Sequence, residues 1–105
     1  MEDTFKIDFK NGAVVDTVML YGNIDAHVER HFDDLFQQIS NNRVVLDFSA
    51  TGRINSMGIA ILLRTFKKIK SEKKCEICIQ GLNKTNSMLF KMTGIFVLAS
   101  EVCSN

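Results

Sequence analysis

Ser56 stands in a motif that could expose a reactive hydroxyl group. The stretch Asn55-Ser56-Met57-Gly58 supplies the second half of the G-x-S-x-G turn that presents the nucleophile of α/β-hydrolases. Ile54 stands where that motif needs its first glycine, and a chain of 105 residues is too short for a hydrolase's histidine and acid. We therefore expect no catalytic serine. Because Asn and Ser are both good helix N-caps, the residues alone leave Ser56 open as a cap or as an exposed functional hydroxyl.

Cys75 and Cys78 have the C-x-x-C spacing of thiol redox motifs and zinc sites. Both chemistries need the two sulfur atoms on one side of the chain, usually at a turn or a helix start. The pair instead falls in residues 75–80, which have the pattern of a β-strand, where side chains three positions apart point to opposite faces. No second pair exists, and Cys103 is remote in sequence. We interpret Cys75 and Cys78 as small buried hydrophobic side chains.

His27 and His31 are spaced so that a helix would place both imidazoles on one face, where they could share a metal ion. The intervening residues do not form H-E-x-x-H, because Glu29 is one position late, and the chain has no third histidine. We interpret the pair as the solvent-facing flank of a helix. The sequence predicts no bound metal and no cofactor.

A basic stretch follows the Ser56 motif. Its members are Arg64, Lys67, Lys68, Lys70, Lys73 and Lys74. Cations are favourable near the C-terminus of a helix, and no aromatic residues are interleaved to stack on bases. We therefore predict a solvated helix face and no nucleic-acid partner.

The composition is that of an ordinary soluble domain, with 46% hydrophobic residues, 24% charged residues and a net charge of +1. This balance favours neither nucleic acid nor a membrane as a partner. No apolar run approaches the length of a membrane span, and the acidic start lacks the pattern of a signal peptide. Three cysteines argue against a disulfide framework. We expect one cytoplasmic domain over residues 1–105.

The N-terminal half predicts a hairpin followed by a helix. Residues 5–10 alternate apolar and charged side chains, as a half-buried strand does, and Asn11-Gly12 is a strong hairpin signal. We expect a second strand over residues 13–21, a loop over residues 22–24, and a helix capped by Asp25. The apolar positions of that helix are Val28, Phe32, Leu35, Phe36 and Ile39.

The centre of the chain predicts a strand, a turn and a long amphipathic helix. Residues 44–48 suit a strand buried on both faces, and residues 49–52 are prone to form a turn. The helix that follows has one periodic apolar face, which we expect to lie against the sheet. That face comprises Ile59, Leu62, Leu63, Phe66 and Ile69.

The C-terminal third continues with the strand over residues 75–80 and a short helix over residues 85–93, capped by Gly94. The apolar side chains of the short helix are Met88, Leu89 and Met92. Residues 96–99 suit a last strand or the start of a terminal helix. The fold class is α/β: a ββαβαβα core in which helices pack against a mixed sheet.

The order of four short motifs resembles that of a STAS domain, the fold of bacterial anti-sigma factor antagonists. Leu46-Asp47-Phe48 is similar to that family's apolar strand ending in Asp, and residues 55–58 to its Asp-Ser-x-Gly. Gly22-Asn23-Ile24-Asp25 and Gly94-Ile95 match two further family motifs. The resemblance extends over about residues 13–98.

The resemblance implies a switch protein that regulates transcription and is not an enzyme. In that family the unphosphorylated antagonist binds an anti-sigma factor, which is also a serine kinase, and thereby frees a sigma factor. Phosphorylation of the motif serine, which maps onto Ser56, breaks the complex, and a PP2C-type phosphatase resets it. Asn55 departs from the family's Asp, so the regulation could be altered. A subunit or scaffold of a transport or signalling complex, without phospho-regulation, is the alternative function.

A partner-binding surface follows from combining the resemblance with the helix period. Met57, Ala60, Ile61 and Arg64 share the helix face opposite the residues expected to face the sheet. We expect that face to dock the anti-sigma factor. The full expected surface is Asp25, Asn55, Ser56, Met57, Ile61 and Arg64. We expect the protein to be a monomer or a weak dimer.

Overall fold

The computed structural model describes residues 5–101. Its elements follow the predicted order of strands and helices, with a short 3-10 turn before the first helix and another after the last. In sequence they are β1 (Lys6–Asn11), β2 (Asp16–Ile24), η1 (Ala26–Val28), α1 (Glu29–Gln38), β3 (Arg43–Ile54), α2 (Ser56–Lys73), β4 (Glu76–Gln80), α3 (Lys84–Thr93), η2 (Ile95–Val97) and β5 (Ser100–Glu101). The predicted ββαβαβα order is confirmed, and the final element is a strand.

The strands form one mixed sheet in the spatial order β1-β2-β3-β4-β5. β1 pairs antiparallel with β2, as the predicted hairpin requires, and every later pair is parallel. The predicted turn at Asn11-Gly12 is wrong, because Asn11 is still in β1 and pairs with Asp16, where β2 begins, so residues 12–15 form the connection. The parallel pairs are joined through α1, α2 and α3, because parallel neighbours need a crossover connection. The sheet therefore brings the carboxyl ends of β2, β3 and β4 to one edge.

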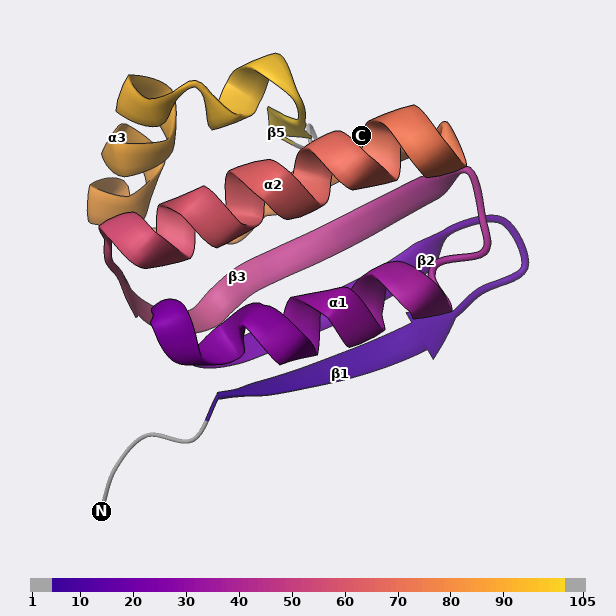
Figure 1. Ribbon diagram of the computed structural model, residues 1–105, viewed down its shortest axis with the longest axis horizontal. Helices are drawn as coiled ribbons and strands as arrows, with labels where there is room; N and C mark the ends of the chain where they lie inside the picture. The colour runs from indigo at the N-terminus through magenta and orange to yellow at the C-terminus, as the bar shows by residue number, and fades with distance from the viewer. Residues whose placement is uncertain (1–4, 102–105) are drawn as a thin grey trace.

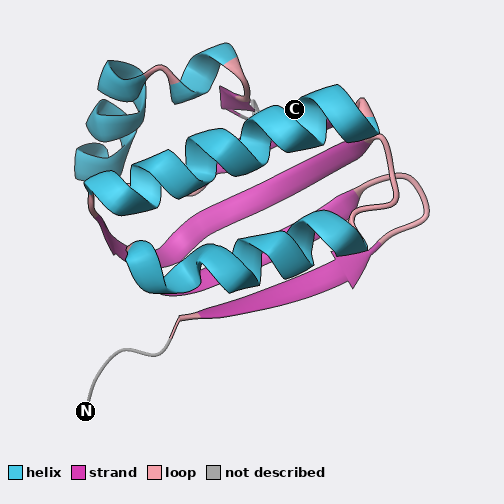
Figure 2. Ribbon diagram, in the orientation of Figure 1, coloured by secondary structure: helices cyan, strands magenta, loops and turns pink. Residues whose placement is uncertain are grey.

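The helices pack on one face of this sheet. Figures 1 and 2 show α1 and α2 side by side in front of it. Phe48 on the same face meets Phe90 of α3 edge to face, with ring centroids 5.4 Å apart. The core lies between these layers, where alternating residues of β2 and β3 such as Leu20 and Leu46 are completely buried. The intervening residues Met19 and Val45, on the other face, are only half-buried. No helix of residues 5–101 has the length and apolar character needed to cross a bilayer.

Two strands run further than the sequence predicted. β2 includes residues 22–24, expected to be a loop, and β3 includes residues 49–52, expected to be a turn. The turn-forming residues are accommodated as irregularities in the β2–β3 pairing, where the register shifts twice. Gly22 adopts a φ of 94°, and the Asn23 side chain accepts a hydrogen bond from the backbone N–H of Arg53 at 2.7 Å. Pairing across the strands thus overrides the local turn preference.

The buried side of α2 differs from the predicted one at two positions. Ile61 was expected to be exposed but is only 3% exposed, whereas Leu63, expected against the sheet, is half-buried. The reason is a second neighbour: α2 packs against α1 as well as the sheet. Ile61 lies on the same side of α2 as Arg64 and Lys68, which contact α1, so α1 covers it. Ile59, Leu62 and Phe66 are buried as predicted.

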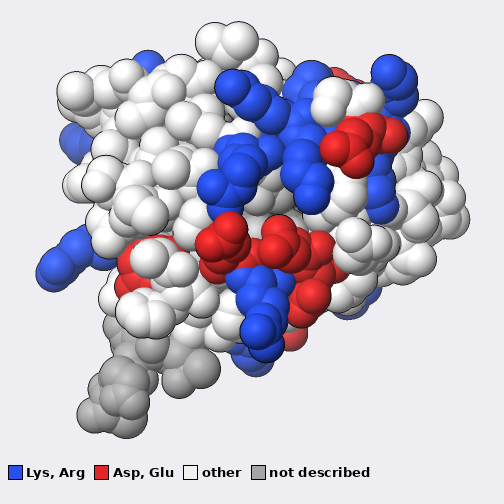
Figure 3. Space-filling view, viewed as in Figure 1, with Lys and Arg blue, Asp and Glu red and all other residues white. Residues whose placement is uncertain are grey.

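The basic residues of α2 are only partly a solvated face. Figure 3 shows Lys and Arg side chains along α2 beside acidic side chains along α1, and Arg64 Nη2 lies 2.7 Å from Glu29 Oε2. Lys68 and Lys73 place their ammonium groups 4.3 and 4.8 Å from the centre of the Phe36 ring. Lys73 also donates to the carbonyl oxygen of Ile39 at 2.8 Å. These cations hold α1 against α2, although each exposed ion pair contributes at most about 1 kcal/mol.

The short helix α3 ends at Gly94 as predicted, and its apolar methionines are not the side chains that it buries. Asn83 accepts a hydrogen bond from the backbone N–H of Asn86, and Gly94 ends the helix at a φ of 84°. Its buried side chains are Asn86 and Phe90. The two methionines instead face solvent, with Met88 58% and Met92 77% exposed.

The cysteines are buried and the histidines exposed, as predicted, although Cys75 lies just before β4 and not within the strand. Cys75, directly before β4, and Cys78 within it are buried free thiols. Burial raises the pKa of Cys75 to about 11 and that of Cys78 above its ordinary value, so neither thiol is poised as a thiolate. His27 and His31 are exposed, at η1 and on α1. Within residues 5–101, no group of three His, Cys, Asp or Glu side chains gathers in a way that could hold a metal ion.

Candidate partner-binding and phosphorylation site

The Ser56 motif lies at the edge of the sheet where β2 and β3 end together. Ile24 and Ile54 are the last paired residues of these two parallel strands. Immediately beyond them, the backbone N–H of Asn55 donates to the carbonyl oxygen of Ile24 at 3.1 Å. The chain then turns into η1 after Asp25 and into α2 after Asn55. Carboxyl ends of parallel strands are the usual position for functional groups in α/β folds.

Asn55, not Ser56, is the N-cap of α2. Its side-chain oxygen accepts a hydrogen bond from the backbone N–H of Gly58 at 2.8 Å, and its carbonyl oxygen accepts one from Ile59 at 2.9 Å. Ser56 is the first helical residue and is exposed. Its hydroxyl makes no hydrogen bond to any residue from 5 to 101. The choice that the sequence left open is thus decided: the hydroxyl is not used as the cap.

Gly58 allows α2 to begin against the end of β2. A β-carbon at this position would overlap with the Ile24 carbonyl oxygen and would lie 2.9 Å from the Ile24 Cγ2 atom. Such separations are shorter than real Cβ contacts, and most of the opposing atoms are backbone. The glycine of the motif therefore has a packing role, because it sets how closely the exposed Ser56 end of α2 approaches Asp25.

Asp25 is the N-cap of η1 and lines a hollow beside the motif. Its Oδ1 atom accepts a hydrogen bond from the His27 backbone N–H at 2.9 Å, and this bond holds the pKa of the Asp25 carboxyl below its ordinary value. The hollow has a volume of about 190 Å³. Its lining residues are Asn23, Ile24, Asp25, Arg53 and Asn55. Asp25 thus presents a carboxylate, and Arg53 a guanidinium, next to the start of α2.

Sequence reasoning missed Asn23 and Arg53 as members of this site. Asn23 lies inside the matched motif Gly22–Asp25, and Arg53 stands two residues before the motif that begins at Asn55. Asn23 was expected in a loop and Arg53 directly after a turn, so nothing indicated that the two residues would meet. The hydrogen bond from the Arg53 backbone to Asn23 joins the ends of β2 and β3 directly under the motif.

The structure brings together most, but not all, of the residues expected to bind a partner. Asp25 and Asn55 line one hollow, and Ser56 and Met57 follow Asn55 at the exposed start of α2, where Met57 is 54% exposed. Arg64 lies further along α2 and is paired with Glu29. Ile61 is buried, so its side chain is not available to a docked partner. What remains is a small surface with a free hydroxyl, one thioether, and charges of both signs.

Asp47 stabilises the neighbouring strand end. Its carboxylate accepts hydrogen bonds from the Ser49 backbone N–H at 2.8 Å and from the Gln80 side chain at 2.9 Å. Burial alone would raise the pKa of Asp47, but the hydrogen bonds from Ser49 and Gln80 outweigh it and the pKa is lowered. Asp47 therefore ties β3 to the end of β4, which is a structural role.

Comparison with known proteins places these features in a family. The family model for the STAS domain matches residues 7–103. No curated protein sequence matches the chain. Among solved structures, an anti-sigma factor antagonist from Mycobacterium paratuberculosis superposes with a TM-score of 0.76 at 19% identity, covering 95% of this chain and 87% of that one.

Two further solved structures share the fold. The Bacillus cell fate determinant SpoIIAA, in its phosphorylated form, has a TM-score of 0.65 at 12% identity and covers 96% of this chain and 93% of its own. A sulfate transporter family protein from Wolinella succinogenes has a TM-score of 0.73 at 10% identity, with 88% and 80% covered. At these identities each likeness shows the fold alone. The family match extends over nearly the whole chain, and the strand order and the motif at the start of α2 agree with it, so the chain belongs to the STAS domain family.

Proposed function

We propose that this protein is an anti-sigma factor antagonist. It acts in the cytoplasm as a non-catalytic binding module that sequesters an anti-sigma factor, itself a serine kinase, and thereby frees a sigma factor for transcription. The observation that carries the proposal is the position of Ser56, which is exposed at the first residue of α2 and has a hydroxyl that no described residue bonds. A kinase needs such an accessible hydroxyl, and a partner docked on it would sense any group added there.

The proposed switch works because a phosphate on Ser56 is compatible with the folded protein but not with the complex. A phosphate on Ser56 would lie at a helix N-terminus, where the helix dipole and free N–H groups favour an anion by about 0.3–1 kcal/mol. In an interface, the same group of nearly two negative charges must lose its hydration, at a cost of several kcal/mol unless a cation meets it. A loss of about 3–4 kcal/mol weakens binding by a hundredfold or more. Phosphorylation therefore releases the partner without unfolding the protein, and a PP2C-type phosphatase restores binding.

The docking surface centres on the start of α2. Asn55, Ser56 and Met57 form its exposed middle, and the hollow with Asp25 and Arg53 lies at its side. The partly exposed Met57 is the apolar contact, because a flexible thioether adapts to a partner surface. Arg64 extends the surface along α2. Its guanidinium is already paired with Glu29, so in the complex it would contact both Glu29 and the partner.

Phosphotransfer from the natural partner tests this proposal. A pull-down from native lysate with mass spectrometry identifies the partner, which is then purified and incubated with this protein and ATP. We expect phosphopeptide mapping to find phosphate on Ser56 in the wild-type protein and in Ser49→Ala, a control at another exposed serine. No phosphate is expected in Ser56→Ala. Phosphate on another residue would reject the mechanism.

A second candidate function is a subunit or scaffold of a transport or signalling complex without phospho-regulation. Asn55 favours this candidate, because the motif's usual Asp is replaced by a residue that keeps the cap but lacks the charge. The fold shared with a sulfate transporter family protein is consistent with it. A stable complex whose partner carries no kinase activity, and a Ser56 that stays unmodified, would favour this function over the antagonist.

A further inference from the structure

The outer edge of β1 is built to receive another strand. β1 is the first strand of the sheet order, and no strand among residues 5–101 pairs with its outer side. An edge strand presents unpaired backbone N–H and C=O groups, which can extend the sheet into a second molecule. The Ser56 site lies elsewhere, at the ends of β2 and β3, so the edge of β1 is separate from that site.

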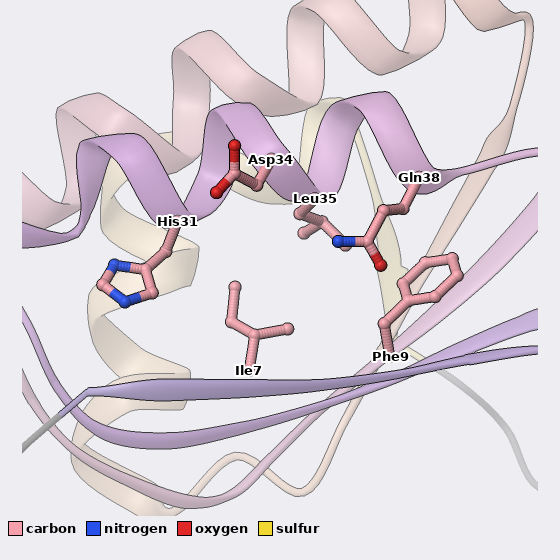
Figure 4. A pocket seen from close by; sticks show the side chains of 6 residues that line it. All are labelled: Ile7, Phe9, His31, Asp34, Leu35 and Gln38. Carbon is pink, nitrogen blue, oxygen red and sulfur yellow. The ribbon is translucent and has the colours of Figure 1, made fainter.

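Both faces of the sheet are hollowed next to β1. On the helix side, Ile7 and Phe9 point from β1 toward α1 and leave a hollow of about 250 Å³ that Leu35 also lines (Figure 4). On the opposite side, a hollow of about 400 Å³ is lined by Asp8, Lys10 and β2 side chains such as Met19. An added strand directs its side chains alternately to the two faces, and hollows on both faces are what strand addition needs.

We propose that the strand that pairs with β1 is β1 of a second copy, antiparallel across a twofold axis at Ile7. In this register Phe5 lies opposite the partner copy's Phe9 and Ile7 opposite its own counterpart, so the helix-side row is entirely apolar. On the other face, Lys6 lies opposite Asp8 of the second copy, and the symmetry forms this pair twice. The strand is thus complementary to itself in charge.

The neighbouring registers are less favourable. Moving the axis to Asp8 places the two Asp8 carboxylates opposite each other and Lys6 opposite Lys10, and like charges directly opposite destabilise a strand pair. Moving the axis to Phe9 pairs Ile7 with Asn11, a residue whose amide already donates to Asp16 and Ser40. The Phe9 axis does place Asp8 opposite Lys10, but only the Ile7 axis combines pairs of opposite charge with an entirely apolar row on the helix side.

The paired segment is short, so the dimer is weak. Only the segment from Phe5 to Phe9 takes part, and a contact of this length buries less surface than a stable interface does. We therefore expect association only at high protein concentration. Lys6 and Asp8 carry little of the monomer's stability, because their side chains are 60% and 59% exposed and lie 4.0 Å apart. The two charges can therefore be changed without loss of the fold.

A charge swap tests both the dimer and its register. Sedimentation velocity from micromolar to millimolar protein should show a monomer–dimer equilibrium for the wild type. Asp8→Lys creates two Lys–Lys contacts and should weaken the dimer about tenfold. The double variant Lys6→Asp with Asp8→Lys restores the opposite pairs and should recover wild-type association. Lys70→Glu, at an exposed position of α2, is the control and should dimerise as the wild type does.

Amide chemical shifts locate the contact. On raising the concentration, the shifts that move should belong to residues 5–11 in the wild type, and melting temperatures should show that every variant is folded. A protein that stays monomeric up to millimolar concentration would overturn the proposal and leave the edge to an extended segment of another protein. Shifts confined to α3, with its exposed Met88 and Met92, would also overturn it, as would a double variant no better than Asp8→Lys.

Discussion

Gly58 of α2 packs directly onto the backbone carbonyl group of Ile24, the last residue of β2. The same carbonyl oxygen accepts the hydrogen bond from the backbone N–H of Asn55. One peptide group therefore meets both the cap and the third helical residue of α2, and it sets where the helix begins over the sheet. Because Ser56 lies between those two residues, the contact also sets the exposure of the Ser56 hydroxyl.

Gly58→Ala should destabilise the protein by about 1–3 kcal/mol, the usual cost of overpacking. Helix propensity alone predicts the opposite sign, since Ala is better than Gly in a helix by up to about 1 kcal/mol. Urea unfolding measures the difference. Ala60→Gly, at an exposed position of the same helix, measures the propensity term by itself. A Gly58→Ala variant that is more stable than the wild type would show that the contact with Ile24 is not tight.

Ser56→Asp should keep a melting temperature within a few degrees of the wild type, because an anion at the start of α2 is tolerated. It should also lose binding to the anti-sigma partner. Ser56→Ala should bind constitutively, because it removes the site of modification. It should not disturb the fold, because the Ser56 hydroxyl makes no hydrogen bond to any described residue. Calorimetric titration with the purified partner measures both effects. Equal affinity of the Ser56→Asp variant and the wild type would separate Ser56 from the interface.

Ile61→Lys and Met57→Lys should separate folding from binding. A lysine at Ile61 places a charge in the core beside α1 and should cost about 3–5 kcal/mol, which is a large part of a small domain's stability. A lysine at Met57 is solvated and should change stability by less than about 0.5 kcal/mol. Met57→Lys should nevertheless weaken partner binding about tenfold or more. Thermal unfolding and a binding assay on both variants check this, and unchanged binding of Met57→Lys would exclude Met57 from the surface.

The buried Asp16 carboxylate should make stability depend on acidity. It accepts hydrogen bonds from the backbone N–H groups of Ser40 and Asn41 at 2.9 and 3.0 Å, and from the side chains of Asn11 and Asn41. Burial alone would raise the pKa of Asp16, but these hydrogen bonds outweigh it and hold the pKa below its ordinary value. The stabilisation is therefore complete above the unfolded-state pKa of about 3.9 and is lost as the pH falls through the lower folded-state pKa.

Asp16→Asn should thus cost about 1.5–3 kcal/mol at neutral pH, because an amide group would face donors that now meet an anion. The difference from the wild type should shrink as the pH falls below about 4. Urea unfolding at a series of pH values measures it. Asp33→Asn removes a charge at an exposed position of α1 and isolates the effect of the buried hydrogen bonds. A difference that stays constant down to acid unfolding would contradict the assignment.

Much of this fold is determined by local features of the sequence. The strand of residues 44–48 and the cap at Gly94 depend on side-chain period and on backbone preference, which act within a few residues. The hairpin was also predicted locally, but the position of its turn was not: Asn11 stays in β1 and pairs with Asp16, and the connection is residues 12–15. The order of elements follows from these signals, and so does the sheet, since parallel strands separated by helices have few possible arrangements. Ser56 could be located at the start of α2 for the same reason.

The tertiary structure alone decided that Ile61 joins the buried side of α2 in place of Leu63, and how far β2 and β3 extend. Ile61 and Leu63 are equally apolar, and only the position of α1 makes the first a core residue and the second half-buried. Asn23 and Arg53 are thirty residues apart and meet because β2 and β3 pair beyond their predicted ends. These outcomes depend on contacts between segments remote in sequence, and no local preference of either segment encodes them.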